Sequence, residues 1–112
     1  MTPIFQPVPS LMLVGVAGDV ADGCARAFPA LLVLRVGHTA AAVERMMVTR
    51  PLVVVLGAEL PRGDVEFVVQ CARDIQAEVL RESSVPPAEF VEAVQQSLLV
   101  AEENRERPTS PE

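Results

Sequence analysis

The feature that most constrains this chain is a fourfold alternation of short apolar runs with helix-length amphipathic segments. The apolar runs occupy residues 11–16, 31–36, 52–56 and 77–81. The first three contain almost no polar residues, which is typical of strands that are covered on both faces. Strands that alternate with helices in this way form a parallel sheet with right-handed crossovers. The sequence therefore predicts an α/β fold, a three-layer αβα sandwich around a parallel sheet of about four strands.

The segments between the runs have the periodicity of helices. Their apolar residues recur at spacings of three and four, which predicts helices over residues 19–28, 39–50, 64–75 and 87–104. Residues of capping type stand at the first three starts, namely Asp19, Thr39 and Asp64. The second helix is expected to turn Val43, Met46 and Met47 inward. The last helix is expected to bury Phe90, Val91, Val94, Leu98 and Ala101.

The chain is short enough to form one domain, which we expect over residues 11–104. Residues 1–10 carry three prolines and are expected to form an extended lead-in. Residues 105–112 are polar, contain two prolines and are expected to be disordered. The N-terminus has no basic region followed by an apolar core, and no apolar run approaches the length of a membrane span. These features predict a cytoplasmic protein without a membrane partner.

Charge and cysteine content limit the possible partners. The net charge is −6, which argues against a nucleic-acid partner because phosphate binding needs a basic surface. All nine basic residues are arginines, so chemistry that requires a lysine amine is excluded. The two cysteines, Cys24 and Cys71, lie in separate apolar helical patterns and are expected to be free thiols. We expect neither a metal nor a cofactor.

Two stretches resemble a known family. Residues 50–61 (RPLVVVLGAELP) are similar to the third strand of the receiver domain of two-component response regulators, with Pro51 and Pro61 at the family's proline positions. Residues 76–94 are similar to the last strand and last helix of that domain, and the resemblance extends from Leu11 to about Leu99. It implies a flavodoxin-like sheet and a role in bacterial signal transduction. The predicted third helix ends at Ile75, and the stretch that resembles the family's last strand begins at Gln76. The family's fourth strand and fourth helix are therefore expected to be missing, which gives strand order 2-1-3-5 in receiver numbering.

The resemblance also locates the residues that receiver phosphorylation would need. Gly57 occupies the position of the phospho-acceptor aspartate, and Gly15 and Val16 occupy the positions of the acidic pair that holds Mg²⁺. Ser83 stands in place of the invariant lysine, and the strand with the switch hydroxyl is absent. Mg²⁺ requires several carboxylate oxygens, and none of the four aspartates ends a strand. The sequence therefore predicts a degenerate receiver that neither binds Mg²⁺ nor accepts a phosphoryl group, and that is not an enzyme.

Without this chemistry, the leading hypothesis is a protein–protein interaction module that regulates signalling independently of phosphorylation. The last helix carries an apolar run wider than one core-facing stripe requires. The expected interaction surface is this helix with the adjacent sheet edge, through Phe90, Val94, Leu98, Leu99 and Val100. The partner is another protein, and a second copy of the chain, giving a homodimer, is the simplest case.

Two alternatives remain open. Glycines lie at or just after the ends of several predicted strands (Gly15, Gly18, Gly37 and Gly57), and they would let a small ligand approach the backbone at the carboxyl ends of the strands. The simpler interpretation is that they serve turn geometry. His38, the only histidine, has no acid or nucleophile placed to work with it and is interpreted as a capping or surface residue at a strand-to-helix turn. A subunit that is active only within an enzyme complex is the other alternative.

Overall fold

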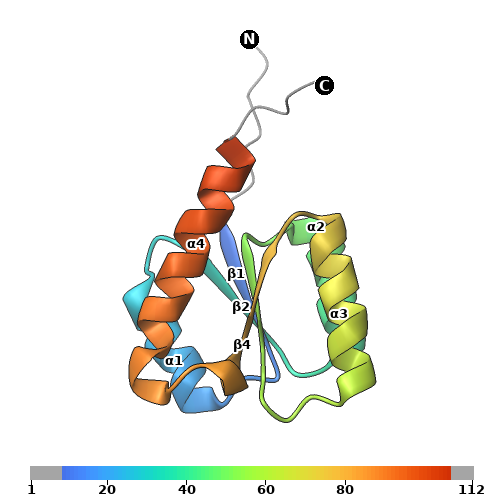
Figure 1. Ribbon diagram of the computed structural model, residues 1–112, viewed down its shortest axis with the longest axis horizontal. Coiled ribbons are helices and arrows are strands. Elements are labelled where there is room, and N and C mark those ends of the chain that lie inside the picture. The colour runs from blue at the N-terminus through green and yellow to red at the C-terminus, as the bar shows by residue number, and fades with distance from the viewer. Residues whose placement is uncertain (1–8, 107–112) are drawn as a thin grey trace.

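The computed structural model describes residues 9–106. Four strands alternate with helices along the chain (Figure 1), which confirms the predicted α/β class. The elements are β1 Ser10–Val14, α1 Gly18–Ala27, β2 Leu32–Val36, α2 Thr39–Thr49, β3 Val53–Leu56, α3 Arg62–Asp74, β4 Glu78–Arg81 and α4 Phe90–Glu106. Two single-turn 3-10 helices, η1 (Glu82–Ser84) and η2 (Pro87–Glu89), connect β4 to α4.

The four strands form one parallel sheet in the order β2-β1-β3-β4. Met12 of β1 lies opposite Leu34 of β2 on one side and opposite Val54 of β3 on the other. Val54 in turn lies opposite Val79 of β4. Every residue of β1 and β3 is buried, whereas β2 and β4 at the edges are partly exposed. The expected strand order, with the apolar strand β3 at the centre, is confirmed.

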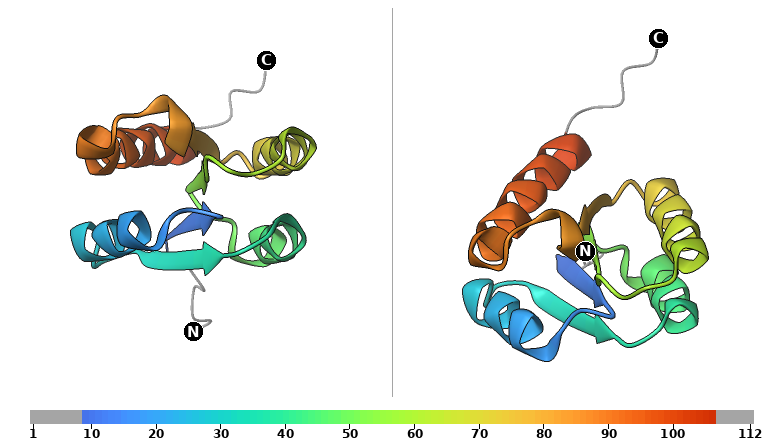
Figure 2. Two further views of the ribbon diagram at one scale, coloured as in Figure 1. Left: turned by 90° about the horizontal axis from the view of Figure 1, so that it is seen from below. Right: turned by 60° about the horizontal axis from the view of Figure 1, so that its bottom comes forward.

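Helices cover both faces of the sheet, as Figure 2 shows: α1 and α4 lie on one face, and α2 and α3 on the other. Strand side chains alternate between these layers, because successive residues of a strand point to opposite faces. On β1, Leu11 and Leu13 pack under α1 and α4, whereas Met12 and Val14 pack under α2 and α3. The fold is thus the predicted three-layer sandwich, and the central strands supply both cores.

The connection from α3 to β4 is only a turn. Gln76 adopts a left-handed conformation with φ of 62°, and the Ala77 amide donates to the Ala72 carbonyl at 2.9 Å. This bonding ends a helix sharply and reverses the chain. The chain therefore returns at once to the sheet, where β4 pairs directly with β3. No further strand or helix lies between α3 and β4, which confirms the predicted omission of one strand and one helix.

The predicted caps were wrong, although the helices themselves were predicted correctly. The N-cap positions are Ala17, His38 and Pro61, and none of them makes a side-chain cap hydrogen bond. The first and third helices begin earlier than expected, so Asp19 and Asp64 fall in their first turns, where negative charge favours the helix dipole.

The inner stripe of α2 also needs a correction. Met46 is buried as expected, whereas its neighbour Met47 is 58% exposed. Consecutive residues of a helix point in directions about 100° apart. Met46 and Met47 could therefore both face the sheet only if each stood at one edge of the buried stripe. Met46 lies at the centre of the stripe, and Met47 therefore turns to solvent.

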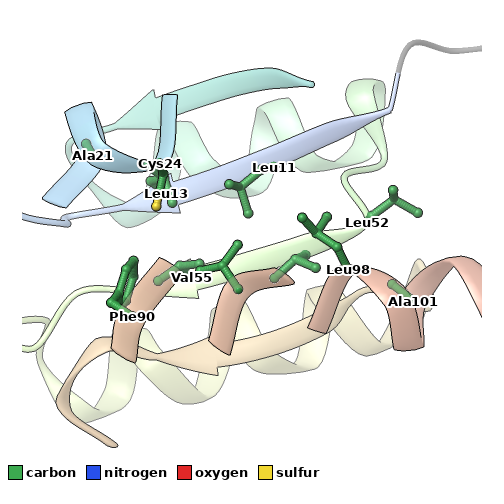
Figure 3. Close-up of a cluster of buried hydrophobic side chains, with 11 residues drawn as sticks. Leu11, Leu13, Ala21, Cys24, Leu52, Val55, Phe90, Leu98 and Ala101 are labelled. Carbon is green, nitrogen blue, oxygen red and sulfur yellow. The ribbon is translucent and has the colours of Figure 1, made fainter. Parts of the chain in front are cut away.

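Helix α4 packs on β3 and β4 through one stripe of side chains. Figure 3 shows Phe90, Leu98 and Ala101 directed from α4 into the core that includes Leu11 and Val55. Val91 was expected in this stripe but is 38% exposed, because it stands at the flank of the helix.

The ends of the domain differ slightly from the expected bounds. β1 begins at Ser10, one residue earlier than the predicted lead-in allowed, and α4 continues through Glu106 into the predicted tail. The remainder of the lead-in and tail, apart from Pro9, lies outside the described residues. Within residues 9–106, no helix combines the length and apolar character that crossing a bilayer requires.

Candidate functional site

The carboxyl ends of β1 and β3 meet at the point where the chain crosses from one side of the sheet to the other. In doubly wound folds, ligands bind in the crevice at this point. Gly15 directly follows β1, and Gly57 directly follows β3. The Gly57 amide donates to the Val14 carbonyl at 2.8 Å, so the two loops are bonded together. The crevice between these loops is therefore the expected position of a ligand-binding site in this fold.

Gly57 fits this crevice only because it lacks a side chain. A Cβ atom at residue 57 would lie 2.0 Å from the Gly15 carbonyl oxygen and 2.5 Å from the Gly15 carbonyl carbon. Both atoms belong to the backbone, so they cannot rotate away as a flexible side chain would. The sequence identified Gly57 as a missing acceptor. The geometry adds that the position has no room for an acceptor.

Leu60 packs beside Gly15 in this crevice. Gly15 has φ of 64°, and its amide donates to the Val36 carbonyl at 2.8 Å, which fixes the loop after β1. A Cβ atom at Gly15 would lie 3.0 Å from Leu60 Cδ2. The two glycines thus allow close backbone contact and close contact with a leucine. This supports the turn-geometry interpretation for Gly15 and Gly57 over a direct role in ligand binding.

Of the other positions assigned by the resemblance, Ser83 lines the same cavity as Gly57, whereas Val16 does not. Val16 is half-buried and packs against the core under α1 and α4. Ser83 lies within η1, where it is exposed. The carboxylate of Glu82 is held at this edge, because its Oε1 accepts a hydrogen bond from the Ala58 amide at 3.0 Å. Among residues 9–106, no group of three or more histidine, cysteine, aspartate or glutamate side chains could hold a metal ion.

Two open cavities flank the crevice. The larger, of about 440 Å³, lies at the ends of β3 and β4 and is bounded by the first turn of α3. Its charged lining residues are Arg62, Glu66 and Arg81. The smaller, of about 180 Å³, lies at the ends of β1 and β2 beside Gly18 and Gly37. The larger cavity reaches Gly57 and Leu60 of the crevice, and the smaller one reaches Gly15.

The remaining reactive side chains offer no catalytic arrangement. His38 is exposed at the N-cap position of α2, and its side chain makes no hydrogen bond or ion pair within the described part of the chain. Cys24 is buried and unpaired. Burial raises the pKa of the Cys24 thiol above its usual value of 9.0, although the positive charge of Arg35 acts in the opposite direction. The thiol is therefore neutral and unreactive near pH 7.

Several solved structures superpose on this chain. Neither a protein-family model nor a curated protein sequence matches the chain. A two-component transcriptional regulator AraC from Clostridium phytofermentans superposes with a TM-score of 0.61 at 14% identity, covering 87% of this chain and 97% of that one. The signal receiver domain of a LuxO repressor protein from Vibrio parahaemolyticus gives 0.59 at 14% identity, covering 89% and 98%. This chain has the receiver fold.

A third receiver structure agrees with the first two. The signal receiver domain of an HD domain-containing protein from Pseudomonas fluorescens superposes with a TM-score of 0.58 at 12% identity, covering 96% of this chain and 98% of that one. Within the receiver fold, the positions assigned to the phosphorylation site follow the expected strands: Gly15 comes after β1, Gly57 after β3 and Ser83 after β4. Their identification as degenerate site positions remains a prediction.

The expected interaction surface on α4 needs a correction. Phe90, Val94 and Leu98 are 3%, 0% and 6% exposed, because they form the stripe that packs on the sheet. They therefore support the helix from beneath and cannot contact a partner directly. Leu99 and Val100 are 54% and 44% exposed and do lie on the outer side. Of the five predicted residues, only Leu99 and Val100 are exposed, and their role in a contact surface stays a prediction.

The structure also exposes apolar side chains that the sequence analysis missed. Met47 and Val48 of α2 are 58% and 82% exposed, and Phe67 of α3 is 56% exposed. All three belong to the helices that cover the opposite face of the sheet from α4. A closer analysis of the helical period would have found Val48, which falls on the outer face of α2. These exposed residues of α2 and α3 provide a control for the exposed residues of α4.

Proposed function

We propose that this chain is a receiver-like signalling module that is not phosphorylated and acts through contacts with other proteins. The observation that carries the proposal is the close packing at residue 57, where a Cβ atom would lie 2.0 Å from the Gly15 carbonyl oxygen. An aspartyl phosphate with its Mg²⁺ would need space at this position and a set of carboxylates around it. The module is therefore non-enzymatic, and its regulation depends on its surface.

The contact surface in this proposal is the outer side of α4 with the neighbouring edge of the sheet. Leu99 and Val100 are exposed there. The Asn104 side chain donates to Glu78 Oε1 at 3.2 Å, so the end of α4 and the edge strand β4 lie together. Exposed apolar side chains beside an unpaired strand edge favour association with another protein. A second copy of the chain is the simplest partner, since symmetric dimers are the commonest oligomers.

This proposal is tested by a single charged substitution on α4. Val100→Glu should place a carboxylate in the interface and weaken self-association by about tenfold or more. Analytical ultracentrifugation over a wide range of protein concentrations measures the change. Leu99→Glu should have the same effect, since Leu99 is the other exposed residue of the surface.

The matched control is Val48→Glu on α2. Val48 is more exposed than Val100 and belongs to a helix on the opposite face of the sheet. The substitution should leave association unchanged. If the wild-type chain stays monomeric and neither α4 variant alters any interaction, the proposed surface is wrong. If only Val48→Glu disrupts association, the interface belongs to α2 and α3 instead.

A second candidate function is the sensing of a small ligand at the carboxyl ends of the strands. The observation that favours it is the cavity of about 440 Å³ beside β3 and β4, a volume within the usual range of ligand sites. A thermal-shift screen of nucleotides, acidic metabolites and neutral sugars tests it. A ligand that stabilises the chain would support sensing, and no shift from any compound would remove this candidate.

A further inference from the structure

The larger cavity has a chemical character that the sequence analysis did not anticipate. Arg62 and Arg81 both line it, although they come from different elements. Arg81 is the last residue of β4, and Arg62 is the first residue of α3. Ser83 supplies a hydroxyl-bearing residue to the same lining, to which Gly57 and Ala58 also belong. Tertiary structure alone brings these residues together.

Neither arginine is neutralised by the protein. Among residues 9–106, neither the Arg62 nor the Arg81 guanidinium makes an ion pair or a side-chain hydrogen bond. By contrast, the Arg35 guanidinium is paired with Asp22 at 2.6 Å. The cavity lining has one acidic residue, Glu66, and the Glu82 carboxylate lies next to the lining on the Ala58 amide. Neither carboxylate makes an ion pair with Arg62 or Arg81 in the described part of the chain, so both guanidinium groups are available to a bound anion.

The first turn of α3 adds positive potential at the cavity. Arg62, Val65 and Glu66 near the start of that helix line the cavity, and the helix begins without a side-chain cap. Uncapped first-turn amides carry a partial positive charge that favours an anion nearby. Neighbouring Ala58 already uses its amide to bind the carboxylate of Glu82 at 3.0 Å. This edge of the sheet therefore holds one internal anion and has further donors available for another.

We propose that this cavity binds a small phosphorylated molecule through the guanidinium groups of Arg62 and Arg81. Guanidinium groups bind phosphate oxygens in a bidentate manner. Two arginines and the Ser83 hydroxyl offer more donors than the two oxygens of a carboxylate can use, which favours phosphate. The volume of about 440 Å³ leaves space beyond one phosphate for the molecule that carries it. The binding is non-covalent and uses neither an acceptor at residue 57 nor Mg²⁺.

This inference rests on the second candidate function above, and the experiment separates the two. The ¹⁵N-labelled full chain is titrated with inorganic phosphate and then with a nucleoside monophosphate, at constant ionic strength, while amide chemical shifts are recorded. Saturable shifts should concentrate at Gly57, Ala58, Arg62 and Ser83. The nucleoside monophosphate should bind more tightly than phosphate, because it also contacts the rest of the cavity.

The variants are chosen so that charge alone cannot explain the result. Arg62→Gln and Arg81→Gln should each weaken binding by about tenfold. Arg73→Gln removes the same charge from the last turn of α3, outside the cavity, and should leave the affinity unchanged. Shifts scattered over the surface, or equal losses in all three variants, would overturn the proposal. If neutral ligands stabilise the chain while phosphate shifts no amide near Arg62 and Arg81, sensing stands and this inference falls.

Discussion

Gly57 shows how one residue can have two independent consequences. Its lack of a carboxylate removes the acceptor that the receiver resemblance assigns to this position. Its lack of a Cβ lets the loop after β3 approach the Gly15 carbonyl, where a Cβ would come within 2.0 Å. The first consequence follows from the sequence and the resemblance. The second follows from packing, and it means that the surrounding loops are built around glycine here.

Adding a single methyl group at this position should therefore destabilise the fold. We expect Gly57→Ala to lower the free energy of unfolding by about 3 kcal/mol, because backbone atoms must move to admit the Cβ. Gly23→Ala is the control, since a Cβ there meets nothing within 4 Å in the middle of α1. It should raise the free energy of unfolding by about 0.5–1 kcal/mol. Urea denaturation measures both, and equal effects would contradict the packing argument.

Restoring the acceptor should not restore the chemistry. Gly57→Asp adds the same Cβ as alanine and brings a carboxylate to a crevice in which Leu60 packs beside Gly15. Because residues 9–106 contain no cluster of three or more metal-ligating side chains, we expect no labelling by acetyl phosphate in the presence of Mg²⁺. Mass spectrometry of the intact protein measures the label. Labelling of Gly57→Asp but not of Gly57→Asn would show that the crevice can open enough to react.

At the scale of elements, the apolar patterns located every strand and helix but not how each one ends. The helices α1, α2 and α3 begin without side-chain caps. Two helix ends depend on non-glycine residues in the left-handed conformation, Arg50 after α2 and Gln76 after α3. No residue-type preference predicts these positions, because glycine is the usual choice. They are imposed by the strands that must follow immediately.

The turn at Gln76 offers a direct test. A side chain in the left-handed conformation costs about 1–2 kcal/mol, part of which glycine recovers. Gln76→Gly should therefore raise the free energy of unfolding by about 0.5–1 kcal/mol, after the greater flexibility of the unfolded glycine is included. Gln70→Gly, inside α3, should lower it by about 1 kcal/mol. The same substitution should thus have opposite signs in the two places, as thermal and urea denaturation can determine.

At the scale of the whole molecule, two hydrophobic cores share one thin sheet. The cluster under α1 and α4 and the cluster under α2 and α3 are separated by β1 and β3, whose residues alternate between them. Loss of either helical layer would expose half of each central strand. The two layers should therefore unfold together, even though they lie on opposite faces of the sheet.

A matched pair of core truncations tests this cooperativity. Val68 of α3 and Val94 of α4 are both fully buried, on opposite faces of the sheet. Each change to alanine should cost about 2 kcal/mol from lost apolar burial and the cavity left behind. The double variant should be additive within about 0.5 kcal/mol, because the two sites belong to different clusters. A single unfolding transition is expected throughout, and a transition that splits in one variant would mean that the layers are separable.

The expected surface on α4 illustrates where sequence reasoning ended. Its period correctly marked Phe90, Val94 and Leu98 as core residues, yet the same residues were also assigned to a contact surface, and only burial resolved the conflict. The exposed apolar residues of α2 and α3 were missed because apolar residues span a wide arc of these helices. The sequence does not indicate which side of that arc the neighbouring elements cover. The cavity lined by Arg62 and Arg81 could not be predicted from the sequence, because these two residues are far apart along the chain.

The sequence by itself determined the layered α/β architecture, and together with its resemblance to receiver domains it predicted the strand order and the absence of a further strand and helix between α3 and β4. It did so because strand and helix periods are local, and because the step from Ile75 to Gln76 leaves no room for another unit. Tertiary structure decided what the loops at the strand ends do. Contacts between Gly57 and Gly15, the packing of Leu60 beside Gly15 and the meeting of two arginines around one cavity join residues distant in sequence. Such contacts depend on distances of a few ångströms, and no local pattern encodes those distances.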